Sequence, residues 1–350
     1  MNETPDMLNT DCNNKMSKSA VLWGLTALLL VTLLFSLCLG RYPMKADEIF
    51  YMIVDRLGIR GFENSFSPQQ EIAFWNVRMP RLIIAFLVGA ALSVAGCSYQ
   101  TIFQNPMASP DILGASSGAG LGAALAIYFG FSSWSITAMA FIFSLAAVSL
   151  SYLLSLYAKS DRILALVFSG IVIGSLCKAG VSYIKLVADP TNQLPSITYW
   201  LMGSIVGAKN SEAAFVFWPM LIGFTPLMLL RWRMNILSLG DAEAKTTGVN
   251  AERLRFISLL ASTLLTAAAV SVSGLIGWVG LVIPHMMRRL IGVNLKYLMP
   301  ASLIFGGTFM VFVDNFSRSA TQTEIPLGIV TAFIGAPFFM YIITRRNSNQ

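Results

Sequence analysis

The stretch LIIAFLVGAALSVAGCSYQTIFQ, residues 82–104, decides the fold class, because no charged side chain interrupts it. A helix of roughly 20 apolar residues crosses the hydrocarbon core of a bilayer. In lipid a helix satisfies its backbone hydrogen bonds internally, whereas an open strand does not. The stretch therefore predicts a transmembrane helix.

Similar apolar blocks recur along the chain and predict an all-α membrane protein with about ten transmembrane helices. The block at 276–291 is short and contains Pro284, so we expect a short or proline-broken span there. Such a span is tolerated where protein or a water-lined cavity satisfies its backbone. Residues 195–206 are too few to cross and are expected at one interface. The other blocks lie at about 20–39, 112–130, 134–157, 163–187, 211–230, 254–273, 298–316 and 325–343.

Composition agrees with a membrane protein. Hydrophobic residues make up 55% of the 350 residues, and charged residues only 12%, against roughly 25% in soluble domains. The mean hydropathy is +0.67. The net charge of +7 does not indicate nucleic acid as a partner, because the basic residues lie mostly between apolar blocks and form no patch with interleaved aromatics.

The basic residues also predict an orientation. Residues 1–19 are polar and are expected to form a cytoplasmic tail, and residues 20–346 the membrane domain. With ten spans, both termini are then cytoplasmic, and that side carries most of the lysines and arginines, as the positive-inside rule requires. The basic residues left on the outer side need a separate explanation.

Two patterns concern helix packing. Glycines spaced by four, at Gly114, Gly118 and Gly122, predict close helix contacts in lipid. In addition, LVGAALSVAG at 87–96 resembles LLTAAAVSVSG at 264–274. In the predicted topology the two segments run in opposite directions, which is the pattern of an inverted repeat.

No catalytic or metal-binding constellation is present. His285 is the only histidine, and no GxxxxGK[ST] phosphate loop occurs. We therefore expect no enzyme activity in this chain, no metal and no bound cofactor. The cysteines form no CxxC pair and are interpreted as small apolar side chains; they are Cys12, Cys38, Cys97 and Cys177.

The polar segment RWRMNILSLGDAEAKTTGVNAER, residues 231–253, is the most informative non-apolar stretch. It predicts a short helix that ends at Gly248 and a following helix that is capped by Asn250. Such helices across the mouth of a membrane protein suit a docking surface. A solvated loop is the alternative interpretation.

Several motifs together resemble the FecCD-type, or BtuC-like, permeases of ABC importers, which move iron-siderophores, haem and vitamin B12. The resemblance covers about residues 20–346, with Met107 where the family usually has Leu. The motifs are RMPRLIIAFLVGAALSVAG (78–96), QNPMASPDILGASSGAGLGA (104–123), YWLMGS (199–204), LSLGDAEAKTTGVN (237–250), SGLIGWVGLVIPHMMRRLIG (273–292) and EIPLGIVTAFIGAPFFMYII (324–343).

The resemblance implies a role for three groups of residues. Coupling helices at about 236–252 would dock on an ATPase subunit through Gly240, Asp241, Glu243, Ala244 and Gly248. A cytoplasmic gate would include Asn105, Pro106, Met107, Ser160 and Asp161. Outward-facing arginines would pair with carboxylates of a substrate-binding protein; these are Arg78, Arg81 and Arg318.

Each role has a simpler alternative. Arg78 and Arg81 could snorkel at a helix start, and the Asn-Pro gate could be ordinary turn chemistry. Asp314 lies four residues before Arg318, which is the spacing of a helical ion pair that would orient this arginine. Lys178, within a span, could face the transport path or a partner inside the bundle.

The implied function is the membrane-spanning permease of an ABC importer in a bacterial or archaeal inner membrane. It would move an iron chelate, haem, a corrinoid or an oxyanion. Its implied partners are two ATPase subunits, a substrate-binding protein, a second permease chain and lipid. A secondary transporter driven by an ion gradient is the main alternative, although no repeated pair of carboxylates lies mid-span. A membrane enzyme is a further alternative.

Overall fold

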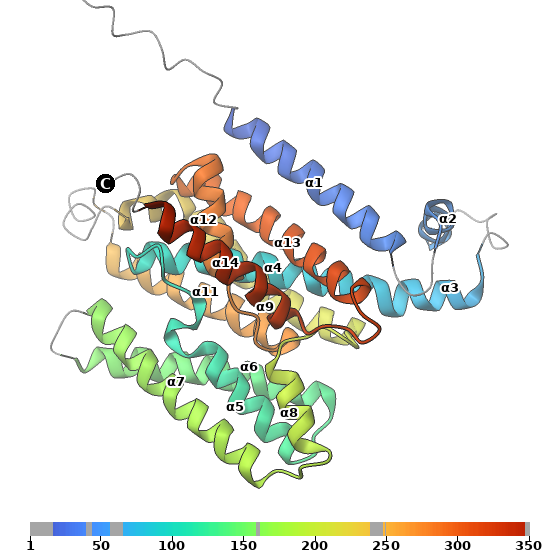
Figure 1. Cartoon of the computed structure of the whole chain (residues 1–350). Helices are drawn as coiled ribbons and strands as arrows, with labels where there is room; N and C mark the ends of the chain where they lie inside the picture. The colour runs from blue at the N-terminus through green and yellow to red at the C-terminus, as the bar shows by residue number, and fades with distance from the viewer. Residues whose placement is uncertain are drawn as a thin grey trace, which may run out of the picture.

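The computed structural model describes residues 17–39, 44–56, 66–158, 162–238, 248 and 250–346, and all regular elements among them are helical (Figure 1). Each predicted apolar block forms a helix. These helices are α1 (Lys18–Cys38), α4 (Met79–Ile102), α5 (Ala115–Tyr128), α6 (Ser133–Leu156), α7 (Arg162–Val187), α9 (Asn210–Leu237), α11 (Ala251–Ser273), α12 (Val279–Ile291), α13 (Leu295–Ser319) and α14 (Leu327–Arg346). The short segment near 195–206 overlaps α8 (Gln193–Leu201).

Within the described residues, seven helices are long and apolar enough to cross a membrane, and α5 and α14 are shorter apolar helices. The remaining predicted span, α12, is short, as expected. The chain is therefore a multi-pass membrane protein, and the all-α prediction is confirmed.

The helices form two packed groups (Figure 1). Helices α5, α6 and α7 contact one another, and α8 packs on α5. Helix α4 packs against α11, α12 and α13, with α9 on α11 and α1 on α13. Contacts of α11 with α5 and α6 join the groups.

Helix α4 is the centre of the larger group. In the apolar 18-residue window within 68–102, 78% of the residues are buried, and the corresponding window of α11 follows with 72%. The two helices are antiparallel neighbours, and the Tyr99 and Thr263 hydroxyls hydrogen-bond between them at 3.0 Å. The similar segments 87–96 and 264–274 therefore lie on the two central helices.

Glycine allows this central packing. A Cβ added at Gly96 would lie 1.9 Å from the Gly280 carbonyl oxygen, and one at Gly89 would lie 2.2 Å from that of Gly306. Gly118 and Gly122 likewise face backbone carbonyls of α6, so the close contacts predicted for these two glycines are confirmed. Small residues are what membrane helices need at such contacts, because lipid tails are as apolar as leucine.

The 40–81 region, which lies between the first two predicted spans, contains helices. They are α2 (Ala46–Arg56), α3 (Pro68–Ala73) and a π-helical turn η1 (Phe74–Arg78) that runs into α4. A capping box starts α3, because Gln70 N–H donates to Ser67 Oγ at 3.2 Å and Ser67 N–H donates to Gln70 Oε1 at 2.7 Å. Neither α2 nor α3 is evident as an apolar block in the sequence, because both are short and partly polar.

Helix α12 is not broken at its proline. It continues through Pro284, and the non-helical segment precedes it at 274–278. Because Pro284 has no N–H, the Gly280 carbonyl lacks its helical donor. The side-chain amide of Gln100 on α4 donates to this carbonyl at 3.4 Å, which offsets the loss inside the bundle.

We predict opposite effects for two glycine-to-alanine changes in helices. Alanine normally favours a helix by about 0.5–1 kcal/mol over glycine. Gly24→Ala, with no atom within 4 Å of the new Cβ, should leave the thermal unfolding midpoint unchanged or raised. Gly96→Ala should lower it by several degrees, because α4 and α12 must separate. Equal midpoints for the two variants in detergent would contradict this packing.

Candidate functional site

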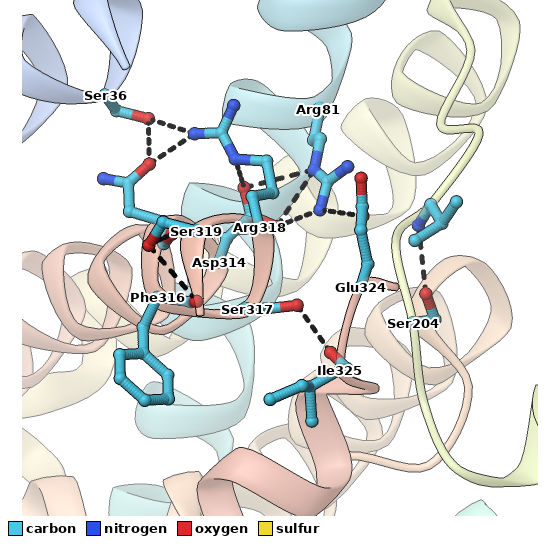
Figure 2. Close-up of polar contacts among 12 residues, drawn as sticks. Ser36, Arg81, Ser204, Asp314, Phe316, Ser317, Arg318, Ser319, Glu324 and Ile325 are labelled. Carbon is cyan, nitrogen blue, oxygen red and sulfur yellow. Dashed lines mark hydrogen bonds and ion pairs between the residues drawn. The ribbon is translucent and has the colours of Figure 1, made fainter. Parts of the chain in front are cut away.

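A buried cluster of charges joins α4 to α13 at one end of the bundle (Figure 2). Arg81 Nε donates to Asp314 Oδ1 at 3.0 Å, and Arg81 Nη2 donates to the same oxygen at 2.8 Å. The Arg81 side chain is 9% exposed and that of Asp314 is 3% exposed. Both charges are therefore compensated inside the chain, as buried ions must be.

The segment after α13 completes this cluster. Glu324 Oε2 lies 2.8 Å from Arg81 Nη2. The neighbouring backbone is fixed as well, because Ser317 Oγ donates to the Ile325 carbonyl. Arg81 thus has two carboxylate partners, one on α13 and one on the segment that leads to α14.

Arg318 extends the cluster toward α1. Its Nε lies 3.3 Å from Asp314 Oδ2, so the predicted helical ion pair is confirmed. Its Nη2 donates to Ser36 Oγ at 3.1 Å and also to Asn315 Oδ1. Ser36 Oγ donates to Asn315 Oδ1 at 2.8 Å, so polar contacts attach α1 to α13 (Figure 2).

The structure brings the three predicted docking arginines to one end of the bundle, where the Arg78 guanidinium donates to the Leu37 carbonyl at the end of α1. Arg78 and Arg81 are each 7% exposed, and the Arg318 side chain is 14% exposed. All three have partners inside the chain. Docking of a binding protein on these arginines remains a prediction. Arg318 is the most accessible of the three.

The predicted gate residues Asn105, Pro106 and Met107 form a turn after α4. Asn105 Oδ1 accepts from Met107 N–H at 2.9 Å, and the Asn105 carbonyl accepts from Ala108 N–H at 3.0 Å. The predicted non-helical turn is therefore confirmed, whereas its gating role stays a prediction.

Gln104 connects this turn to α9. Its side-chain amide donates to the carbonyl of Leu237, the last residue of α9, at 3.0 Å. Gln104 has a φ of +48°, a conformation that is uncommon for a residue with a side chain. Sequence reasoning missed this contact, because nothing local indicates which carbonyl a glutamine reaches.

The coupling segment is described only at its ends. Gly248 has a φ of +73°, and Asn250 Oδ1 accepts from Arg253 N–H at 2.9 Å, which confirms the predicted cap of α11. Near this end, a cavity of about 590 Å³ is lined by residues of α6, α7 and α11, among them Phe256. The other predicted residues lie outside the described part of the chain; they are Gly240, Asp241, Glu243, Ala244, Ser160 and Asp161.

The non-helical segment that follows α8 and the one that precedes α12 meet between the two ends of the bundle. Ser204 N–H donates to the Ser273 carbonyl at 2.7 Å, and a Cβ on Gly203 would lie 2.4 Å from the Leu275 carbonyl. An apolar cavity of about 560 Å³ borders them, lined by α8, the 274–278 segment and α14. Irregular backbone of this kind occurs in membranes where protein or a water-filled cavity surrounds it.

The sequence pointed to Arg81, Asp314 and Arg318, but not to the contacts that join them to Glu324, Ser36 and Asn315. Asp314 was identified by its spacing to Arg318, but neither Ser36 nor Asn315 carries a signal in the sequence, because they lie 279 positions apart. Among the described residues, no group of three or more His, Cys, Asp and Glu side chains could hold a metal ion.

Comparison with known proteins defines the class. A solved structure of a metal-chelate type ABC transporter in an inward-facing conformation has a TM-score of 0.83 with 37% identity, covering 93% of this chain and 99% of that one. The molybdate import permease MolB of Haemophilus influenzae is 38% identical over 94% of this chain and 98% of its own length. The hemin transport permease HmuU of Yersinia pestis is 34% identical, with coverage of 92% and 96%.

The fold and these relatives define a membrane transport permease. The FecCD transport family matches residues 28–345, and the chain belongs to this family. The resemblance inferred from the motifs is confirmed.

We predict that the buried and exposed arginine–carboxylate pairs differ sharply in importance. Asp314→Asn leaves Arg81 partly unpaired and should lower the free energy of unfolding by roughly 3–5 kcal/mol. Glu252→Gln removes the partner of Arg162 in an exposed pair, since the Glu252 side chain is 71% exposed and that of Arg162 is 52% exposed. This change should lower the free energy of unfolding by only about 0–1 kcal/mol. Thermal unfolding in detergent measures both. A loss for Glu252→Gln as large as that for Asp314→Asn would contradict this assignment.

Proposed function

We propose that this chain is the membrane-spanning subunit of an ATP-driven importer for a metal-bearing cargo. The observation that carries the proposal is the agreement with the metal-chelate type ABC transporter over 93% of the chain. The relatives support the same class of cargo, since their names include molybdate, iron chelatin, hemin and cobalamin transport. The cargo is an iron chelate, haem, a corrinoid or a metal oxyanion, received from a substrate-binding protein.

ATP hydrolysis belongs to a partner in this proposal. The chain has no phosphate-binding loop, so separate ATPase subunits would dock on the segment between α9 and α11. Gly248 and the Asn250 cap support a defined start of α11 there. The Gln104 bond to Leu237 links the turn at 105–107 to the beginning of this segment. Closure of the ATPase pair would then rotate the helices as rigid bodies.

The docking surfaces for the two partners lie at opposite ends. Asn235, near the end of α9, donates to Asn294 at the start of α13, at 3.1 Å, whereas Arg318 is near the end of α13. A helix of 25 residues spans roughly 37 Å. The charge cluster with Arg318 is therefore a membrane thickness away from the coupling segment, on the outer side when both termini are cytoplasmic.

A second permease chain would complete the transport path. Helix α14 exposes Phe333, 77% accessible, and Met340, 63% accessible, and both line the apolar cavity beside α8. A contiguous apolar surface beside a cavity suits another copy or a sister chain. Two chains would enclose one path, and two ATPase subunits would dock beneath them.

The first test is transport in proteoliposomes that contain this permease with its ATPase. We expect ATP to drive uptake when the cognate binding protein is added, with molybdate, a ferric chelate, haemin and cyanocobalamin as probes. An ATPase with a substituted phosphate-loop lysine is the control and should abolish uptake. Uptake driven by an ion gradient with this inactive ATPase would overturn the proposal in favour of a secondary transporter.

The second test concerns the outer docking surface. Arg318→Gln removes a positive charge near the surface and should weaken binding of the substrate-binding protein by about tenfold at low salt, mainly through slower association. The control is Arg233→Gln, an exposed arginine on α9 at the other end of the bundle. Binding is measured to nanodisc-embedded permease. An unchanged affinity for Arg318→Gln, or an equal loss for Arg233→Gln, would contradict docking at the charge cluster.

A further inference from the structure

Helix α1 lies on the outside of the bundle (Figure 1), and its length fixes where its ends stand in the bilayer. Only 6% of its apolar window is buried, and Trp23 and Leu30 are 74% and 56% exposed. Its 21 residues span roughly 31 Å, which matches a hydrocarbon core roughly 30 Å thick. Lys18, the first residue of α1, therefore lies at the level of the lipid headgroups.

The start of α13 brings a second lysine to the same place. Helices α1 and α13 pack against each other. The Lys18 ammonium lies over the Tyr297 ring, 5.1 Å from its centre, and the Lys296 ammonium lies 5.6 Å from the same centre. Asn294 Oδ1 accepts from Lys296 N–H at 3.0 Å, which caps α13 and fixes its first turn. Two cations from different helices thus converge on one aromatic ring.

The charge of these lysines is not compensated within the described part of the chain. There, no carboxylate forms an ion pair with Lys18 or Lys296, and the first turns of α1 and α13 contain no acidic residue. Arg289, in the last turn of α12, is exposed as well, and α12 contacts α1. Since like charges repel one another, an anion at this place would be strongly favoured.

The surface around the lysines is apolar, which distinguishes a lipid from a soluble anion. Leu290 is 59% exposed and Val293 is 77% exposed, and both lie between the end of α12 and the start of α13. Trp23 and Tyr297 are side chains of the kind that gathers where a membrane meets water. Cations beside exposed apolar side chains match a molecule with an anionic headgroup above acyl chains.

We propose that the adjoining starts of α1 and α13 bind the headgroup of an anionic phospholipid. Lys18 and Lys296 bind the phosphate, and the acyl chains lie along the exposed face of α1. Basic clusters of this kind at the ends of membrane helices bind anionic headgroups. With both termini cytoplasmic, the lipid belongs to the inner leaflet. The site depends on neither the cargo nor the energy source of transport, and it attaches a little-buried helix to the bundle.

Lipid-dependent stability tests this site. The delipidated permease in detergent is titrated with phosphatidylglycerol, and we expect its thermal unfolding midpoint to rise by several degrees, because a ligand of the folded state stabilises it. Phosphatidylcholine with the same acyl chains, and inorganic phosphate, should have little effect. The double change Lys18→Gln with Lys296→Gln should remove most of the rise, whereas Lys18→Arg with Lys296→Arg should keep it.

The matched control removes two charges elsewhere at the same end of the bundle. Arg233 on α9 and Arg253 on α11 are both exposed, and Arg233→Gln with Arg253→Gln should keep the rise. Equal shifts with both phospholipids, a rise that the lysine variant keeps, or an equal loss in the control would overturn the inference. A full shift with inorganic phosphate would overturn it in favour of a soluble anion.

Native mass spectrometry provides an independent measurement that does not rely on unfolding. After incubation with phosphatidylglycerol, the unmodified chain should retain one more lipid molecule than the variant with Lys18→Gln and Lys296→Gln. The arginine control variant should retain the same number as the unmodified chain. Equal numbers for the unmodified chain and the lysine variant would contradict a lipid site at these two helix starts.

Discussion

The close approach of α4 to its neighbours is the constraint on which the rest of this structure depends. Apolar side chains gain little by leaving lipid for a protein interior of equal polarity, so backbone proximity and polar contacts must hold the helices together. Gly96 against Gly280 and Gly89 against Gly306 supply that proximity. The Gln100 contact to the carbonyl that Pro284 leaves unpaired belongs to the same interface. The non-helical segment before α12 packs against a different part of the chain, the end of α8 and α14, which approach it at Gly203, Gly328 and Gly335.

The charge cluster and the Gln104 bond occupy the two ends of the same helix. Arg81 begins α4 among buried carboxylates, and Gln104 follows its last turn with a bond to the end of α9. A rigid, central helix with fixed contacts at both ends is suited to move as one body. It therefore connects the surface proposed for a binding protein with the segment proposed for an ATPase.

The apolar helices could be predicted from the sequence, because the bilayer leaves a long apolar segment few other structures. All ten apolar blocks became helices, because a long run without charges has few alternatives in a bilayer. The Asn250 cap and the Asp314–Arg318 pair were predictable because their partners are close in sequence. The bonds of Arg81 to Glu324 and of Ser36 to Asn315 were not, since nothing local encodes a contact across more than two hundred residues. Helix α2 was not predicted because its apolar run, residues 49–54, is far shorter than a span.

The position of α1 has a consequence for how the chain is assembled. Only 6% of its apolar window is buried, its main neighbour is α13, and its polar contact to Asn315 spans 279 residues. At roughly 5–20 residues per second of synthesis, the first span waits on the order of tens of seconds in the bilayer before its partner is made. During biogenesis α1 is thus a lone helix in which Ser36, near the C-terminal end, still lacks its hydrogen-bond partner. Among the described helices, α1 is therefore synthesised first but is among the last to gain its tertiary contacts.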